Sequence, residues 1–110
     1  MIFLDIVIDY DRRVVMKKNQ LVELTKTEFD LFYYLLQQEG KVISRDQLVG
    51  VLRPMNGNTY PRSIDVYIQR LRKKLGSGPH NQEYINTIRG VGYKVSWPIM
   101  TIQELGLRVF

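Results

Sequence analysis

The first 24 residues alternate between short apolar runs and polar turns. Apolar and β-branched side chains dominate residues 2–8, 13–16 and 20–24, and the polar segments 10–12 and 17–19 separate them. Runs of this length bounded by turn residues are typical of strands in an antiparallel sheet. The pattern therefore predicts three strands that pair into a small sheet at the N-terminus.

Helical spacing replaces this alternation after residue 24. Apolar and aromatic side chains now recur three and four positions apart, at Phe29, Phe32, Tyr33 and Leu36. Thr25 and Glu28 match a capping box, because the threonine hydroxyl can accept a hydrogen bond from the backbone of Glu28 while the glutamate side chain reaches back. Gly40 suits the left-handed residue that follows many helices. The segment between Thr25 and Gly40 is predicted to be a helix.

A second, shorter helix is expected to follow. Ser44 and Gln47 match a capping box ahead of the apolar residues Leu48 and Leu52. Pro54 lacks a backbone N–H and is therefore expected to end this helix. Residues 53–60 should then form a turn-rich connection.

The last part of the chain predicts a third helix and a hairpin. Pro61 suits the first position of a helix that should run to Leu75, before the glycines of residues 76–78 break it. Residues 84–89 and 93–97 have the composition of strands, and residues 90–92 between them make a glycine-rich tip. The predicted order is three strands, three helices and two strands.

Composition limits the classes that need to be considered. The 110 residues are 45% hydrophobic and 25% charged, which is ordinary for one globular domain with a single modest core. Cysteine is absent, so disulfides and thiolate metal sites are excluded. No run approaches the roughly 18 apolar residues of a membrane span. We therefore expect a cytoplasmic protein with no membrane contact.

Enzyme chemistry is not indicated by the sequence. His80 is the only histidine and lies in a glycine-rich loop. No carboxylate pair or base-activated nucleophile is spaced to join it, and soft metal ligands are scarce. The sequence therefore predicts neither an enzyme nor a bound metal or cofactor.

The net charge of +5 is concentrated in one third of the chain. Residues 61–95 hold seven Lys or Arg and two Asp or Glu, whereas residues 1–60 contain eight of each kind. A positive field gathered on one helix and the hairpin behind it is typical of a site for a polyanion. Nucleic acid is the first partner that this distribution suggests.

The third helix has two distinct sides at about 100° per residue. Ile64, Ile68, Leu71 and Leu75 cluster on one side and should belong to the core. The opposite side is centred on Arg62, Val66, Gln69 and Lys73, with Arg70, Asp65 and Arg72 on its shoulders. A solvent-facing stripe of this length fits the major groove of B-form DNA.

A basic helix face can also be merely solvated. Two details favour a partner instead: Val66 is apolar on the outward side, where a thymine methyl would suit it, and Arg89 stands beside two glycines at the predicted hairpin tip. Three helices, the third of them basic, followed by a glycine-tipped hairpin make a winged helix-turn-helix. The predicted fold is therefore α+β, with an N-terminal antiparallel sheet, three helices and a C-terminal β-hairpin wing.

The sequence resembles the OmpR/PhoB-type effector domains of bacterial response regulators over about residues 3 to 97. The matching positions are Leu24-Thr25, Glu28-Phe29, Gly40, Val42, Ser44-Arg45, Leu48, Asp65-Val66, Ile68, Arg70-Leu71-Arg72-Lys73 and Thr87-Ile88-Arg89-Gly90-Val91-Gly92-Tyr93. The basic helix and the glycine-rich wing at this separation are jointly specific. We therefore divide the chain into a winged-helix DNA-binding domain, residues 1–97, and a tail of unknown role, residues 98–110.

The resemblance implies sequence-specific binding of double-stranded DNA and regulation of promoters. The implied protein is either the effector part of a two-component response regulator or a stand-alone relative. It would place helix 61–75 in the major groove, with Arg70 as the main base reader and Arg62, Val66, Gln69, Arg72 and Lys73 as further base or phosphate contacts. It would place Arg89 in the minor groove, and Thr87 and Tyr93 at phosphates.

Other roles follow from the same resemblance. Arg53 stands where the family often has an aromatic residue and is a candidate phosphate contact. Pro54, Met55, Asn56, Gly57, Asn58 and Thr59 correspond to a loop that can touch RNA polymerase. Asp65 and Arg45 are expected to pair helix to helix, and two copies are expected to bind tandem half-sites head to tail. The main alternative is a winged helix that contacts protein or RNA.

Overall fold

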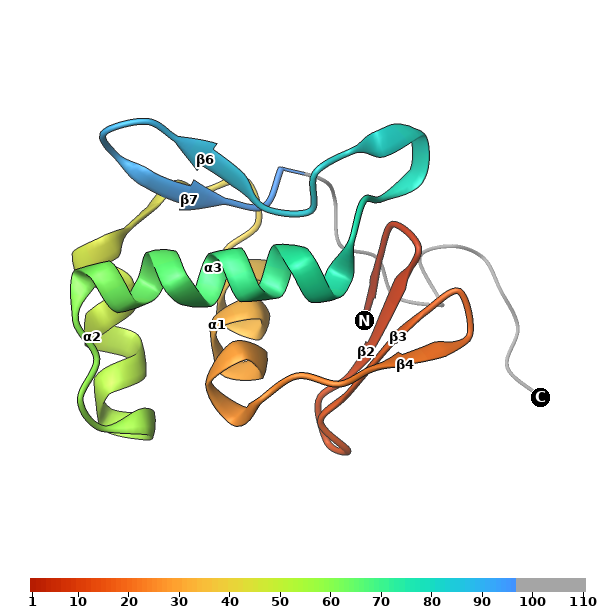
Figure 1. The fold of residues 1–110 in the computed structure, drawn as a ribbon, viewed down its shortest axis with the longest axis horizontal. Coiled ribbons are helices and arrows are strands. Elements are labelled where there is room, and N and C mark those ends of the chain that lie inside the picture. Colours follow the sequence, from red (N-terminus) through yellow and green to blue (C-terminus); the bar gives the residue numbers. More distant parts are fainter. Residues whose placement is uncertain (97–110) are drawn as a thin grey trace.

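The computed structural model describes residues 1–96, which form two small sheets around three helices (Figure 1). The elements are β1 (Ile2–Phe3), β2 (Ile6–Asp9), β3 (Val14–Lys17), β4 (Gln20–Val22), α1 (Lys26–Gln37), β5 (Ile43–Ser44), α2 (Arg45–Asn56), α3 (Pro61–Leu75), a 3-10 turn (Pro79–Asn81), β6 (Asn86–Ile88) and β7 (Gly92–Lys94). This is the predicted winged helix-turn-helix. The predicted tail, residues 98–110, lies outside the described residues.

The N-terminal sheet contains four strands in the order β1-β2-β3-β4, all antiparallel, where the sequence predicted three. The apolar run of residues 2–8 folds back on itself, so that Ile2 lies opposite Val7. The reversal is at Leu4 and Asp5, and Leu4 has a φ of 55°. Hydrophobicity alone did not reveal this turn, because Leu4 continues the apolar pattern while its backbone leaves the strand conformation.

α1 begins and ends much as its sequence predicts. The Thr25 hydroxyl accepts a hydrogen bond from the Glu28 backbone N–H at 3.2 Å, and the Glu28 carboxylate accepts one from the Thr25 N–H at 2.9 Å. The capping box is therefore confirmed. Gly40, with a φ of 79°, follows the helix and donates its N–H to the Val95 carbonyl oxygen at 2.7 Å.

Ser44 caps the start of α2, but the helix does not end at Pro54. The Ser44 hydroxyl accepts a hydrogen bond from the Gln47 N–H at 3.1 Å, while the Gln47 side chain donates to the Tyr34 hydroxyl at 3.3 Å. The hydroxyl half of the predicted capping box is therefore present, whereas the Gln47 side chain bonds Tyr34 and not the backbone of Ser44. The prediction that Pro54 ends the helix is wrong, because α2 continues to Asn56. A proline so near the end removes a single helical hydrogen bond, and contacts between Asn56 and α1 hold the last turn.

α3 has the bounds predicted for the basic helix. Pro61 occupies its first turn, and Gly76, with a φ of 68°, follows its last residue. The four residues predicted to face the core are at most 1% exposed: Ile64, Ile68, Leu71 and Leu75. They join the apolar residues of α1, α2 and both sheets in one core. In Figure 1, α3 lies in front of α1, with α2 at one end and the N-terminal sheet at the other.

The wing is an antiparallel hairpin of β6 and β7, and β5 pairs with β7 on its other side. The strands are shorter than the runs predicted from composition. The two tip glycines have different roles: Gly90 has a φ of 76° in the turn, whereas Gly92 belongs to β7. A Cβ on Gly92 would lie 2.0 Å from the Ile43 carbonyl oxygen, so this glycine permits β7 to approach β5.

Candidate nucleic-acid interface

The outward side of α3 is a ridge of exposed side chains along the helix. Five of the six residues predicted to read DNA are exposed there: Arg62, Val66, Gln69, Arg70 and Lys73. Val66 is 46% exposed although it is apolar. Within residues 1–96, the structure gives the side chains of the four polar members no hydrogen bond or ion pair. We call these five residues the α3 ridge; its donors are available to a partner.

Arg72, the sixth predicted reader, has different surroundings. Its guanidinium donates to the Ile85 carbonyl oxygen at 2.9 Å and to the Thr87 hydroxyl at 2.6 Å. The guanidinium carbon also lies 5.7 Å from the centre of the Tyr93 ring. Arg72 is half-buried between α3 and the wing. It joins these two elements instead of pointing away from the protein.

Tyr93, predicted to contact phosphate, has its hydroxyl directed toward α3. Its side chain is buried, and its hydroxyl donates to the Asp65 carboxylate at 2.6 Å. Burial, and then the bond to Asp65, raise the pKa of the Tyr93 hydroxyl to about 12. The Tyr93 hydroxyl proton is therefore engaged inside the protein, and the predicted phosphate contact of this residue stays a prediction. Thr87 is exposed at the wing while accepting from Arg72, and Arg89 is exposed at the wing tip.

These contacts fix the wing relative to the helices. Asp65 uses one carboxylate oxygen for the Tyr93 hydroxyl and the other for the Arg45 guanidinium at 2.8 Å. The predicted pairing of Asp65 with Arg45 is confirmed. Because Arg45 begins α2 and Tyr93 lies on β7, one carboxylate of α3 connects both neighbours. A wing held this way stays in a defined position beside the α3 ridge.

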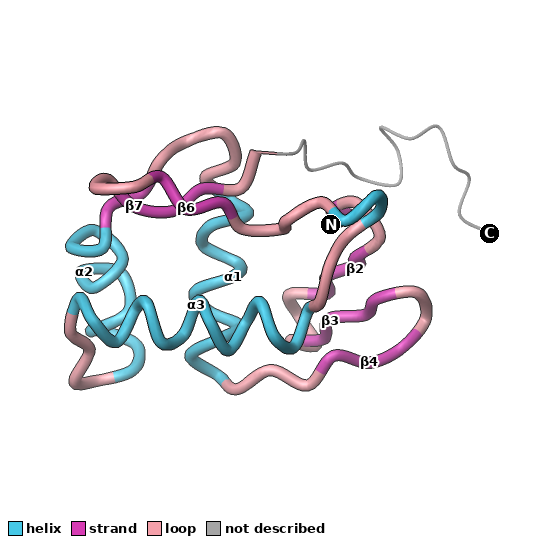
Figure 2. Tube along the Cα trace, turned by 45° about the horizontal axis from the view of Figure 1, so that its top comes forward, coloured by secondary structure: helices cyan, strands magenta, loops and turns pink. Residues whose placement is uncertain are grey.

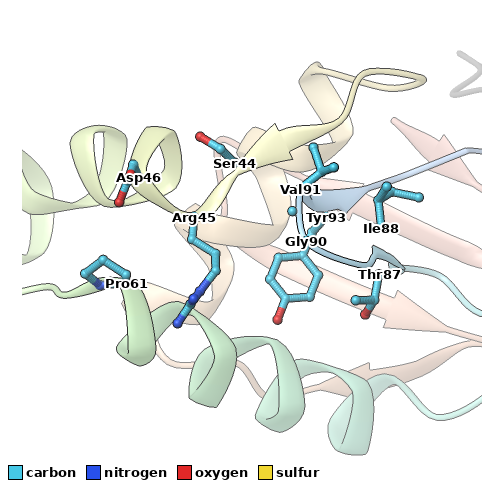
Figure 3. Close-up of a pocket in the computed structure, with 10 residues that line it drawn as sticks. Ser44, Arg45, Asp46, Pro61, Thr87, Ile88, Gly90, Val91 and Tyr93 are labelled. Carbon is cyan, nitrogen blue, oxygen red and sulfur yellow. The ribbon is translucent and has the colours of Figure 1, made fainter.

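A groove lies between the wing and the beginnings of α2 and α3 (Figure 3). It encloses about 430 Å³ and is lined by Ser44, Arg45, Asp46, Pro61, Thr87, Ile88, Gly90, Val91, Gly92 and Tyr93. In Figure 3 the side chains of Arg45 and Tyr93 both extend toward α3. The N-terminus of α2 supplies partial positive charge at this groove, as helix N-termini do.

Part of the loop predicted over residues 53–60 is helical, because α2 continues to Asn56. Arg53, the candidate phosphate contact, donates from two nitrogens to the Thr59 carbonyl oxygen at 3.2 and 2.8 Å. Pro54, Met55 and Asn56 belong to the last turn of α2, whereas Gly57 and Asn58 follow it and are exposed. Thr59, also predicted to belong to the polymerase-contact loop, is 1% exposed.

Two lysines that hold α3 in place were not predicted from the sequence. Lys74 pairs with the buried Glu28 of α1 at 2.5 Å. Burial alone would raise the pKa of the Glu28 carboxyl, but the Lys74 ammonium and the bonds from Thr25 hold this pKa below its ordinary value. Lys17 of β3 donates to the carbonyl oxygens of Leu75 and Ser77, at 2.7 Å each. A preference for cations at helix C-termini could have suggested the Lys17 contact.

Metal sites and membrane-spanning helices were also sought in the described part of the chain. Between residues 1 and 96, no group of three or more His, Cys, Asp or Glu side chains is placed to hold a metal ion. None of the helices in that range is long and apolar enough to cross a membrane. His80, the single histidine, is exposed in the 3-10 turn.

Comparison with known proteins identifies relatives of this domain. Residues 18–95 match the family described as "Transcriptional regulatory protein, C terminal". The DNA-binding domain of RstA from Klebsiella pneumoniae, solved in complex with the RstA box, is 35% identical with a TM-score of 0.72 over 87% of this chain and 95% of that one. DrrB from Thermotoga maritima, an OmpR/PhoB homologue, is 33% identical with a TM-score of 0.76 over 87% of this chain.

Some of the relatives are much longer than this chain. The match covers 43% of DrrB. A streptococcal protein from a family of redox sensors that evolved from two-component response regulators is 33% identical with a TM-score of 0.76, and the match covers 86% of this chain but 41% of that one. The chain therefore spans about two fifths of the length of these two relatives.

Proposed function

This chain belongs to the OmpR/PhoB-type family of transcriptional regulatory C-terminal domains, and on that premise we propose which of its residues read DNA. Its function is sequence-specific binding of double-stranded DNA in the regulation of transcription. The observation that carries the assignment of residues is the α3 ridge, whose donors are exposed and unpaired within residues 1–96, beside a wing held in a defined position.

The α3 ridge is the proposed reader of the major groove. Arg70 has the planar fork that can bond guanine O6 and N7 together, and Gln69 can bond an adenine edge in the same way. Val66 suits contact with a thymine methyl. Arg62 and Lys73 lie towards the two ends of the ridge, where phosphates flank the base pairs being read.

The wing is the proposed contact to the neighbouring minor groove. Arg89 stands at its tip beside Gly90, whose positive φ narrows the turn. An arginine on a narrow tip can enter a minor groove, where the negative potential is strongest over A-tracts. The groove between the wing and α2 leaves room for the intervening sugar-phosphate backbone. Thr87 borders that groove and is a candidate phosphate contact, whereas we assign Arg72 and Tyr93 to positioning the wing.

The physical properties of the α3 ridge favour duplex DNA over the alternative partners. A-form RNA has a deep, narrow major groove that a helix cannot enter. A protein partner would require neither unpaired cations along a whole helix nor a basic wing tip beside it. Catalysis is not a property that we assign, because the family is one of DNA-binding regulators.

The setting of the domain in a whole protein is also a proposal. We infer that it is the effector part of a two-component response regulator or a stand-alone relative, that it acts in the cytoplasm, where bacterial promoters are found, and that two copies bind tandem half-sites head to tail. RNA polymerase would meet the exposed surface of Met55, Gly57 and Asn58 after α2.

Selection of bound sequences from a random duplex pool tests the proposed function. We expect one enriched half-site of a few base pairs, recovered as a direct repeat, and an affinity that falls steeply with salt because phosphates are neutralised. Arg70→Ala should relax the preference at one or two positions of that half-site. Recovery of no common sequence, or equal affinity for heparin and for the selected duplex, would contradict specific recognition.

A further inference from the structure

The turn between β3 and β4 lies against the C-terminal end of α3. Lys17, the last residue of β3, donates to the carbonyl oxygens of Leu75 and Ser77 at 2.7 Å each. Figures 1 and 2 show the β3–β4 hairpin beyond the end of α3 in both views. Two hydrogen bonds from one ammonium, at the negative end of the helix dipole, hold the turn in a fixed place relative to the α3 ridge.

The surface between this turn and α3 is strongly basic. A shallow groove of about 470 Å³ is bordered by Lys17 and Lys18 from the hairpin and by Lys73 and Lys74 from α3, with Glu23 as the one acidic residue among those that line it. The ammonium of Lys17 is engaged by carbonyl oxygens, and that of Lys74 by Glu28.

Lys18 and Lys73 are the two lysines that remain available. Both are exposed, and within residues 1–96 the structure gives neither a side-chain hydrogen bond nor an ion pair. Two unpaired ammonium groups at one groove repel each other, and an anion between them removes that repulsion. Lys73 already belongs to the α3 ridge, so the groove continues the surface that faces DNA.

The length of α3 brings this groove near a DNA backbone. The helix has 15 residues and is about 22 Å long at about 1.5 Å per residue, whereas a major groove is about 12 Å wide. If α3 crosses the groove at an angle, a helix of this length has its ends beside the flanking sugar-phosphate chains. We propose that Lys18 of the β3–β4 turn, together with Lys73, binds backbone phosphate flanking the base pairs that α3 reads. This contact rests on the proposed function.

The conformation of the turn provides a clean substitution. Lys18 and Asn19 have φ values of 49° and 64°, and Lys17 pairs with Gln20, so these two residues form a two-residue turn with positive φ at both positions. Asparagine is favoured at such positions and lysine is not. Lys18→Asn therefore removes the charge while suiting the backbone, and it should not lower the thermal stability.

The experiment compares salt dependence on a selected duplex and on one shortened at the flank near α3's C-terminal end. Lys18→Asn should reduce the magnitude of the slope of log affinity against log salt by about 0.9, and Lys18→Asn with Lys73→Gln by about 1.8. When the salt is raised from 50 to 200 mM, the variant that lacks one phosphate contact should lose affinity by a factor about threefold smaller than the wild type does. On the shortened duplex, Lys18→Asn should have no effect on the slope.

Arg12→Gln is the matched control. It removes one exposed positive charge from the β2–β3 turn, at the other end of β3. If Lys18→Asn changes the slope no more than Arg12→Gln does, the inference is wrong. If the wild-type domain binds no duplex at all, the proposed function itself fails. If binding depends on Arg70 but not on Lys18, the proposed function stands and only the phosphate contact of Lys18 is refuted.

Discussion

Arg70 and Arg72 are two residues apart on α3, and the structure gives them opposite surroundings. Arg70 is exposed on the α3 ridge, whereas Arg72 is half-buried and donates to Ile85 and Thr87 of the wing side. The neighbours Lys73 and Lys74 repeat the contrast, because Lys73 is exposed on the ridge and Lys74 pairs with the buried Glu28.

This comparison shows that positive charge alone does not mark the interface. A cation engaged inside the protein gives stability and positions its neighbours, and the N–H groups that it uses there are not available to a ligand. A cation with no internal partner gains most of its bonds from a ligand. The two kinds of residue should therefore respond differently when each is replaced, one through folding and the other through DNA binding.

The largest expected effect is on folding. Lys74→Met leaves the Glu28 carboxylate buried without its ammonium and should lower the free energy of unfolding by about 2–3 kcal/mol, less than for a fully buried pair because Lys74 is partly exposed. Lys73→Met should change it by about 0.5 kcal/mol or less. Urea unfolding at pH 7 measures both. Equal effects of the two substitutions would remove the distinction between these neighbours.

The same pair predicts a pH dependence. Because the pKa of Glu28 is lowered in the folded protein, its contribution to stability is present above the ordinary value of 4.5 and is lost as the pH falls through the lower folded value. The stability difference between the wild type and Lys74→Met should therefore be largest near neutral pH and shrink below about 4.5. Urea unfolding repeated between pH 7 and pH 3 tests the sign.

Arg72→Ala should give an intermediate effect. It removes two hydrogen bonds and leaves the Ile85 carbonyl unpaired, so we expect a loss of about 1–2 kcal/mol of folding stability. Arg72→Lys should recover part of this loss. Arg70→Ala, the matched substitution, should leave stability unchanged, as thermal unfolding would show. If Arg72→Ala leaves stability unchanged but alters base preference, Arg72 contacts DNA bases. The contrast drawn between Arg70 and Arg72 would then be wrong.

The smallest expected effect is on DNA binding by the wing, and it distinguishes the role of Arg89 from that of the α3 ridge. Arg89→Ala should weaken binding by about 1 kcal/mol, mainly on sites with an A/T-rich flank, where the minor groove is narrow. Arg89→Lys should recover only part of the affinity. Titrations against duplexes with A/T-rich and G/C-rich flanks measure the difference. The same loss on both flanks would reduce Arg89 to a phosphate contact.

Local signals in the sequence account for the parts that were predicted. The capping box of Thr25 and Glu28, the proline at position 61 and the helical spacing from Ile64 to Leu75 each depend on residues within one element. These signals located α1, α3 and the outward side of α3. The wing followed from its glycines and from its place after the basic helix.

Tertiary contacts explain what the sequence did not reveal. The inward direction of the Tyr93 hydroxyl depends on Asp65, which is 28 residues away, and the role of Lys17 depends on carbonyl groups 58 and 60 residues away. Pro54 stays helical because Asn56 contacts α1. None of these partners is visible in a local pattern, and for that reason the internal hydrogen bonds of Arg72 and Tyr93 were not predicted.

The most direct test of the α3 ridge compares Arg70→Ala with Lys73→Ala on the preferred duplex and on a scrambled one, at two salt concentrations. Arg70→Ala should cost about 1–3 kcal/mol on the preferred duplex and little on the scrambled one. Lys73→Ala should weaken both alike and reduce the salt slope by about 0.9. If Arg70→Ala instead weakens both duplexes equally and leaves base preference unchanged, Arg70 is not the base reader.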